Sequence, residues 1–350
     1  MKSRLSVLFG AVLAVLTISS QSMAVDKVTV KGGGKRFVGE ITSMTKTGIV
    51  IKTGLKKDVV QNVKANDILR VEWDAEPARL EAARNAEQAG RLQQALDGYN
   101  LVSEDPKVTS ENLKADLQYF IARTTARMAQ GDPTKADAAI ALLDGFRKTY
   151  GTSFRYYDLL NHLGRTYLVK KDFDNAKRIF VLLGTAPWQD TKLAAQLSEA
   201  RVLLASDKKD EALTVYETVL SKTGNSALLK SIAIEATLGK GTCLQLKGQN
   251  AEAVRVLNSV IERASAADSR TLAGAYTILG DCHSALNQDK DALLAYLHVD
   301  ILFSNQREFH PRALYHLVRL WRQVGKTTRS TAAQVKLETE YPNSEWKTKK

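Results

Sequence analysis

Residues 160–167 read LNHLGRTY, and residues 176–180 read AKRIF. Apolar residues that recur three and four positions apart fall on one face of a helix, so both segments are predicted to be amphipathic helices. Gly164 lies within the apolar face of the first helix, where its small size lets the second helix approach closely. Ala176 is the matching small residue of the second helix. The two segments therefore predict a closely packed helix pair.

The same pattern recurs further along the chain. Residues 276–283 read YTILGDCH, and residues 292–296 read ALLAY. Weaker copies keep the small residue of the second helix at steps of 36, 41, 39 and 38 residues, through Ala176, Ala212, Ala253, Ala292 and Ser330. The pattern resembles the tetratricopeptide repeat (TPR), and it predicts a mainly α fold, a TPR α-solenoid of about six to seven helix pairs over residues 78–345. We expect Gly164 and Gly280 to lie where the two helices of a pair touch.

Residues 25–75 have a different period. Five short runs rich in β-branched residues alternate with turn residues, which favours a small antiparallel β-barrel of the SH3-like or Sm-like kind. Gly32-Gly33-Gly34 is predicted to form a hairpin turn and not a phosphate-binding loop, because a strand follows it. The expected barrel core is Val28, Val30, Phe37, Ile41, Val50, Val59 and Ile68. Because solenoid contacts form between neighbours, we expect residues 76–350 to fold without the barrel.

Residues 1–24 have the composition of a secretory signal peptide. A short basic start precedes an apolar run from Leu5 to Ile18, and the segment ends in Ser-Met-Ala24. This order predicts cleavage after Ala24, and the apolar run is too short to span a bilayer. We therefore expect an exported protein, periplasmic or extracellular, with no transmembrane segment after cleavage. Residues 346–350 (WKTKK) are predicted to form a basic tail.

Three parts of the sequence resemble known exported repeat proteins. A signal peptide, a small barrel that ends in VEWDAEP (residues 71–77) and a TPR array together resemble exported repeat proteins of planctomycete-type bacteria. APW at residues 186–188 is similar to the same group. Residues 313–344, which include ALYHL and EYPNS, are similar to the terminal repeat of Tol–Pal coordinator and outer-membrane assembly scaffolds. These resemblances imply a non-enzymatic scaffold.

The composition excludes several classes of protein. With 44% hydrophobic and 25% charged residues among 350, the chain is neither wholly disordered nor a polytopic membrane protein. Cys243 and Cys282 occupy equivalent positions in neighbouring repeats, which are too far apart for a disulfide, so free thiols are favoured. The five histidines fit no metal-binding motif, and no hydrolase nucleophile motif occurs, so we predict no enzyme, metal or cofactor. The formal net charge of +12 is spread along the chain and does not by itself indicate a nucleic-acid partner.

The concave face of a TPR array is lined mainly by the first helix of each repeat. Counting from the repeat pattern, the predicted groove residues are Asn161, Arg165, Arg201, Thr242, Gln245, Asp281, Tyr315, Arg319 and Arg322. Arginine side chains can bind a carboxylate with two parallel hydrogen bonds. The hypothesis is that an acidic or C-terminal segment of a partner lies across Arg165 and Arg201. The alternative, that these residues are solvated charges on helix faces, stays open.

Two functions are consistent with the sequence. The first is an exported interaction scaffold whose groove binds a peptide or partner protein of the cell envelope. The second is a cell-wall or polyanion-binding module that uses its basic surface. Salt distinguishes them, because polyanion binding falls steeply with ionic strength, whereas binding in a groove of complementary shape falls modestly.

Overall fold

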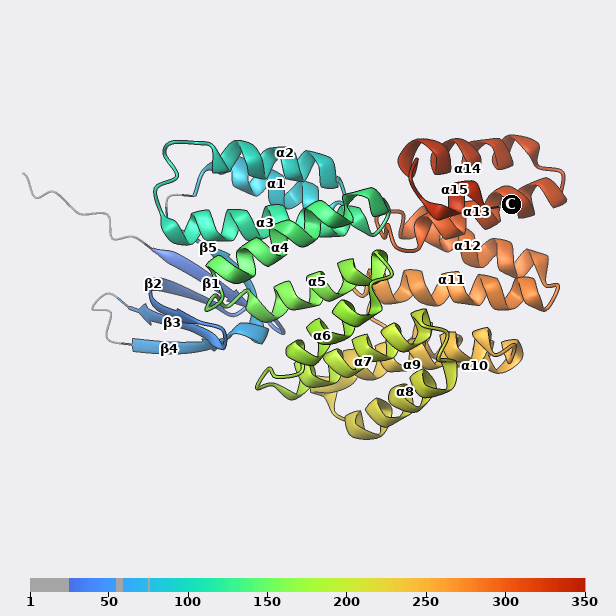
Figure 1. The fold of residues 1–350 in the computed structure, drawn as a ribbon, viewed down its shortest axis with the longest axis horizontal. Helices are drawn as coiled ribbons and strands as arrows, with labels where there is room; N and C mark the ends of the chain where they lie inside the picture. The colour runs from blue at the N-terminus through green and yellow to red at the C-terminus, as the bar shows by residue number, and fades with distance from the viewer. Residues whose placement is uncertain (1–24, 55–58, 75, 350) are drawn as a thin grey trace, which may run out of the picture.

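The computed structural model describes residues 25–54, 59–74 and 76–349, so the predicted signal peptide lies outside the described residues. Within these ranges, one five-stranded sheet precedes fourteen long helices, which pack as seven consecutive pairs, and a short C-terminal helix (Figure 1). The strands are β1 (Asp26–Val30), β2 (Arg36–Thr45), β3 (Gly48–Thr53), β4 (Val59–Lys64) and β5 (Ile68–Glu72).

The helices follow the sheet without interruption by further strands in the described residues. This arrangement confirms the predicted mainly α, TPR-type solenoid. The helices are α1 (Ala78–Gln88), α2 (Leu92–Ser103), α3 (Glu111–Ala129), α4 (Ala136–Thr149), α5 (Tyr156–Val169), α6 (Phe173–Leu183), α7 (Gln189–Ala205), α8 (Lys209–Thr223), α9 (Lys230–Leu246), α10 (Asn250–Arg263), α11 (Ser269–Ala285), α12 (Asp289–Leu302), α13 (His310–Gln323), α14 (Thr327–Glu340) and α15 (Glu345–Thr348).

The small glycines confirm the predicted helix pairing. A Cβ atom on Gly164 of α5 would lie 2.4 Å from Cε1 of Phe180 on α6. A Cβ atom on Gly280 of α11 would lie 2.6 Å from Cε1 of Tyr296 on α12. Carbon atoms in ordinary contact are about 3.5–4.0 Å apart, so only glycine allows this approach. Each aromatic ring packs on the space that the glycine leaves.

The sheet is antiparallel throughout, with the order β4-β3-β2-β1-β5. The triple glycine forms the predicted turn between β1 and β2, and all three glycines have positive φ. The expected core was wrong at Val50 and Val59, because Ile49 and Ile51 face the core and Val59 is 52% exposed. Three consecutive apolar residues in β3 leave the phase of the alternation undefined, so the sequence could not show which face is buried. Closure of the sheet into an SH3-like or Sm-like barrel stays a prediction.

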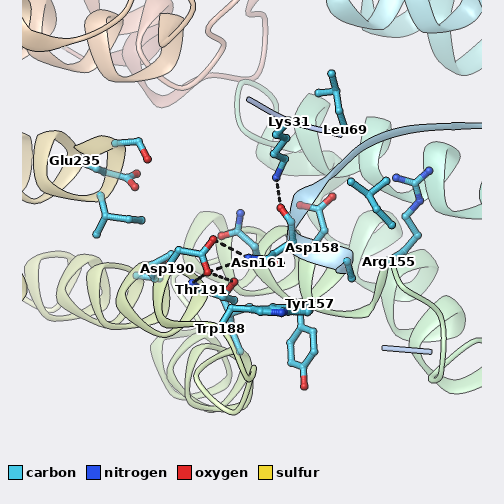
Figure 2. A pocket seen from close by; sticks show the side chains of 18 of the residues that line it. Lys31, Leu69, Arg155, Tyr157, Asp158, Asn161, Trp188, Asp190, Thr191 and Glu235 are labelled. Carbon is cyan, nitrogen blue, oxygen red and sulfur yellow. Dashed lines mark hydrogen bonds between the residues drawn. The ribbon is translucent and has the colours of Figure 1, made fainter. Parts of the chain in front are cut away.

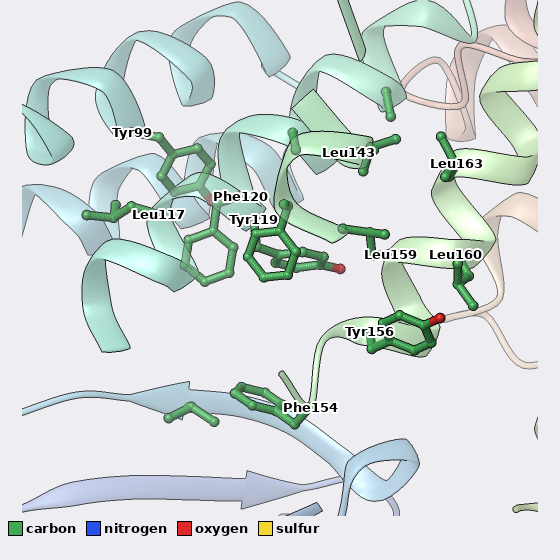
Figure 3. Packing of buried hydrophobic residues seen from close by; sticks show 14 of the residues in the cluster. Tyr99, Leu117, Tyr119, Phe120, Leu143, Phe154, Tyr156, Leu159, Leu160 and Leu163 are labelled. Atoms are coloured by element: carbon green, nitrogen blue, oxygen red, sulfur yellow. The ribbon is translucent and has the colours of Figure 1, made fainter. Parts of the chain in front are cut away.

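The sheet shares its core with the first helix pairs. Val28 and Val71 of the sheet belong to the same buried cluster as Leu117 of α3 and Leu160 of α5. Figure 3 shows the helical part of this cluster, with Phe154 next to the sheet. Other contacts are polar, since the Trp73 indole Nε1 donates to Oδ2 of Asp116 at 3.0 Å. The sheet therefore covers the first helix pairs and is not a detached unit.

The solenoid curves until its two ends meet. Asn343 Nδ2, beyond α14, donates to Oδ1 of Asp132, beyond α3, at 3.1 Å. Arg165 of α5 bonds Glu308, in the loop between α12 and α13, with Nη2–Oε2 at 2.7 Å. In Figure 1 the last helices accordingly lie beside the turns of the first ones. The concave face is therefore bridged at these contacts between the two ends of the solenoid.

Two further features bear on the sequence-based predictions. Cys243 and Cys282 are free, as expected, and both are fully buried. Burial raises the pKa of Cys243 to about 11 and that of Cys282 to about 12. Among the described residues, no helix has the length and apolar character needed to cross a membrane.

Candidate functional site

A cavity of about 590 Å³ lies between the sheet and the inner helices of the solenoid. The sheet region contributes Lys31, Asn66 and Leu69, and the helical wall comes from α5, α7, α9 and α11. Figure 2 shows this cavity from close by, with Lys31 and Leu69 on one side and the residues of α5 and α7 on the other. The sheet thus supplies one wall of the concave face.

One part of the cavity wall is apolar and aromatic. Trp188 packs edge-on against Tyr157, with ring centroids 5.4 Å apart, and both rings line the cavity together with Phe154 and Ile232. Polar groups stand beside them, including Asn161 of α5. An apolar wall with a few polar groups is the usual composition of a ligand-binding site.

A chain of ion pairs crosses the cavity. Arg165 bonds Glu308, and Arg270 bonds the other carboxylate oxygen of Glu308 with Nη2–Oε1 at 2.9 Å. Arg270 also bonds Glu235, with Nη1–Oε1 at 3.2 Å, and Glu235 pairs with Arg201. Three guanidinium groups therefore share two carboxylates, which leaves one positive charge in excess.

The pKa values reflect this excess. Burial opposes ionisation of Glu308, but the charges of Arg270 and Arg165 outweigh it and lower the pKa of this carboxyl to about 2. Burial and the nearby charge of Arg270 lower the pKa of Arg165 to about 10. A guanidinium ordinarily keeps a pKa above 12, so Arg165 is less compensated than its single ion pair suggests. A further anion beside it would be stabilised.

Two smaller cavities share residues with the first one. They measure about 560 Å³ and about 130 Å³, and Arg165 and Arg270 line both the largest and the smallest. Five acidic residues line the three cavities: Glu87, Asp158, Asp190, Glu235 and Glu308. Ten basic residues line them: Lys31, Arg70, Arg84, Arg123, Arg127, Arg155, Arg165, Arg201, Arg270 and Arg307. Basic residues outnumber acidic ones in this lining, although Arg70, Arg84 and Arg155 are paired with acids outside it.

Seven of the nine predicted groove residues divide between two cavities. Asn161, Arg165 and Arg201 line the 590 Å³ cavity. Arg322 is exposed, and Thr242 donates its hydroxyl to the Leu238 carbonyl within α9. The remaining four, Gln245, Asp281, Tyr315 and Arg319, line a separate cavity of about 380 Å³ at the C-terminal end.

The C-terminal cavity is partly filled by the chain itself. Trp346 of α15 packs against Tyr315, with ring centroids 5.6 Å apart, and the Lys349 ammonium lies over the Trp346 ring. Residues that were predicted to form a basic tail therefore lie against α13. Asp281 is buried, accepts a hydrogen bond from the Tyr296 hydroxyl at 2.7 Å and pairs with Arg312. Burial raises the pKa of Asp281 despite the Arg312 charge.

The sequence analysis did not identify Glu235, Arg270 or Glu308. Glu235 carried a signal, because it stands six residues before Gly241, as Asp158 stands six residues before Gly164. Six residues are about 1.7 helical turns, which puts each acid about 120° around its helix from the small residue and off the face that contacts the second helix of the pair. Glu308 had no such signal in the sequence, because it lies in a loop outside the repeat pattern.

Comparisons with known proteins bear on the fold. No protein-family model matches the chain, and no curated protein matches its sequence. A Rap protein complexed with Competence and Sporulation Factor is similar, with a TM-score of 0.51 and 15% identity over 77% of this chain and 76% of that one. A TPR protein from Parabacteroides merdae has a TM-score of 0.44 and 13% identity over 75% and 91%, respectively. PilW, a type IV pilus biogenesis factor, has a TM-score of 0.41 and 16% identity over 67% and 96%. At these identities the likeness bears on the fold alone.

The described residues offer no obvious metal site. Within residues 25–54, 59–74 and 76–349, no group of three or more His, Cys, Asp or Glu side chains is placed to hold a metal ion. The arrangement is suited to binding, because a partly open cavity lined by several arginines has an aromatic wall and side chains that recognise carboxylates.

Proposed function

We propose that this protein is a non-enzymatic, exported interaction scaffold that binds an acidic peptide segment of a cell-envelope protein in its concave groove. The observation that carries the proposal is the 590 Å³ cavity, in which Arg165 and Arg201 stand beside the aromatic pair Tyr157 and Trp188. An extended segment with an acidic residue next to an apolar one would complement both walls. The arginines are already paired with Glu308 and Glu235, so the partner's carboxylate would share them as those glutamates do.

The proposed location rests on the sequence. Residues 1–24 have the order of a signal peptide, and residues 313–344 are similar to the terminal repeat of Tol–Pal coordinator and outer-membrane assembly scaffolds. The Rap protein of similar fold is complexed with Competence and Sporulation Factor, which supports a binding role. Closure of the N-terminal sheet into an SH3-like barrel belongs to the same proposal, in which this unit forms one wall of the groove.

Capture from an envelope fraction, followed by mass spectrometry, would supply a candidate partner, and one variant then tests the site. Reversing Arg165 or Arg201 would place like charges against Glu308 or Glu235, so a less disruptive change is needed. Ser231 is exposed, lines the cavity and lies in the first turn of α9, where an added glutamate suits the helix dipole. Ser231→Glu should weaken an acidic partner, and Ser231→Lys should strengthen it.

Ala251→Glu is the matched control. Ala251 is also exposed and also lies in the first turn of a helix, α10, but it lines none of the cavities described above. If Ser231→Glu and Ala251→Glu change the affinity equally, the cavity is not the binding site.

The second candidate is a polyanion-binding module, which the ten basic residues of the three cavities favour. Its affinity for a soluble polyanion should fall steeply and linearly with salt on logarithmic axes. A groove that recognises one acidic segment should lose much less affinity over the same range. The slope of log affinity against log salt concentration therefore decides between the two functions.

A further inference from the structure

The two ends of the solenoid meet at glycines. Gly90, between α1 and α2, has φ +76°, and a Cβ atom on it would lie 2.5 Å from Cβ of Asn305. A Cβ atom on Gly131, just beyond α3, would lie 3.0 Å from both Cβ and Nε of Arg307. Only glycine lets the loop of residues 303–309 approach this closely. We call this contact the closure junction.

A cavity of about 130 Å³ lies inside the closure junction. Four arginines line it: Arg127 of α3 and Arg165 of α5 from one end of the solenoid, and Arg270 of α11 and Arg307 from the other. Glu308 is the one carboxylate among its lining residues. The space is large enough for a tetrahedral oxyanion and several waters.

The charges around this cavity do not balance. Glu308 is shared by Arg165 and Arg270, as described above. Arg127 bonds Glu87 with Nη1–Oε1 at 3.1 Å, but Glu87 also pairs with Arg123 at 2.5 Å.

Arg307 contributes a further unsatisfied donor. Its Nη2 donates to the Glu340 carbonyl at 3.1 Å, whereas its Nε is buried and has no hydrogen-bond partner among the described residues. A buried donor without a partner is costly, and so is an uncompensated cation. The Arg307 guanidinium also lies over the Tyr341 ring, so the anion that this cavity would take is one that offers Nε an acceptor and offsets part of the excess positive charge.

We propose that the closure junction binds a small oxyanion of the phosphate class, which joins the first and last helix pairs of the solenoid. Guanidinium groups bind phosphate oxygens with paired hydrogen bonds, and here they approach from both ends of the chain. The ligand is inorganic phosphate or the phosphate monoester of a small molecule, which present the same group. This site differs from the peptide groove in Arg127 and Arg307, which do not line the 590 Å³ cavity, whereas Arg165 and Arg270 line both.

Calorimetric titration of the full mature chain with inorganic phosphate, in a chloride buffer of constant ionic strength, tests the proposal. Saturable binding is expected. Arg127→Gln and Arg307→Gln should each weaken it by about tenfold or more, since each removes one charge-assisted pair. Arg255→Gln is the matched control, because Arg255 is exposed on α10 and lines none of the cavities described above, so it should leave phosphate binding unchanged. Glycerol phosphate in a parallel titration distinguishes a monoester from the free anion by its relative affinity.

Absence of saturable phosphate binding to the wild-type chain overturns the proposal. An equal loss in Arg255→Gln and Arg307→Gln also overturns it, because general charge attraction then explains the binding. Circular dichroism of each variant shows whether it is folded, and Arg307→Lys, which keeps the charge, should recover part of the affinity of Arg307→Gln. Ser231→Glu should not alter phosphate binding, so failure of the peptide groove and failure of this site are separable.

Discussion

Replacing Gly280 by alanine tests the packing on which the whole repeat register depends. The new Cβ atom would lie 2.6–2.9 Å from three carbons of the Tyr296 ring, about 1 Å inside ordinary contact. Tyr296 cannot easily retreat, because it is fully buried, its hydroxyl bonds Asp281, and its ring stacks on His316 at 4.7 Å. Overpacking of this kind costs about 1–3 kcal/mol, and the better helix propensity of alanine returns about 1 kcal/mol. We expect a net loss of up to about 2 kcal/mol.

Gly145 gives the matched control for this substitution. It also lies inside a helix, α4, but a Cβ atom on it would meet nothing within 4 Å. Gly145→Ala should therefore stabilise the protein by about 0.5–1 kcal/mol through helix propensity alone. Urea unfolding followed by circular dichroism should move the midpoint down for Gly280→Ala and up for Gly145→Ala. If both variants are stabilised alike, Gly280 does not lie at the contact of α11 with α12, and the register is wrong.

Three further outcomes are expected. Cys243 and Cys282 should resist a thiol reagent at pH 8 in the folded protein and react fully in urea, because burial raises the pKa of both thiols; rapid labelling without urea would contradict this. Burial lowers the pKa of His162 to about 4 and that of His316 to about 3, below the usual 6.5, so their contribution to stability is complete above about pH 6.5 and is lost as the pH falls toward 4. Unfolding in urea at several pH values should show a slope of about 1.4 kcal/mol per pH unit for each histidine, and His162→Gln should reduce that slope. Deleting residues 25–74 should lower the helical circular dichroism, because the deletion uncovers the shared core; an unchanged spectrum would restore the independence of the helical region expected from the sequence.

The repeat pattern predicted the helices and their pairing because the relevant contacts are local. Gly164 and Phe180 are close in the sequence, because they lie on the consecutive helices α5 and α6. Spacing of three and four residues fixes the face of each helix, and the small residue fixes where the neighbour touches. The phase of β3 was not predictable in the same way, since Ile49 and Val50 are equally apolar and only packing against the helices selects Ile49.

The candidate site was predictable only in part, for a geometric reason. Arg165 and Arg201 were placed on the inner face because each lies one residue beyond the small residue of its helix. Their partners depend on curvature that accumulates over many helices. Glu308 reaches Arg165 across 143 residues, and no local pattern encodes that distance. Arg270, which joins the two glutamates, lies ten residues before Gly280 and outside the counted groove positions.

The closed ends and the shared core change how this solenoid should respond to perturbation. A solenoid with contacts between neighbours alone behaves as a sum of repeat and interface terms, so damage at one end stays there. Here the loop of residues 303–309 contacts Gly90, between α1 and α2, and Gly131, just beyond α3. The sheet packs on α3 and α5. A change at either end must therefore act on the other through the closure junction. The same closure brings arginines from distant repeats into one space, where each glutamate serves two of them. The unbalanced positive charge is thus a consequence of the curvature, and an anion at the closure junction would offset it.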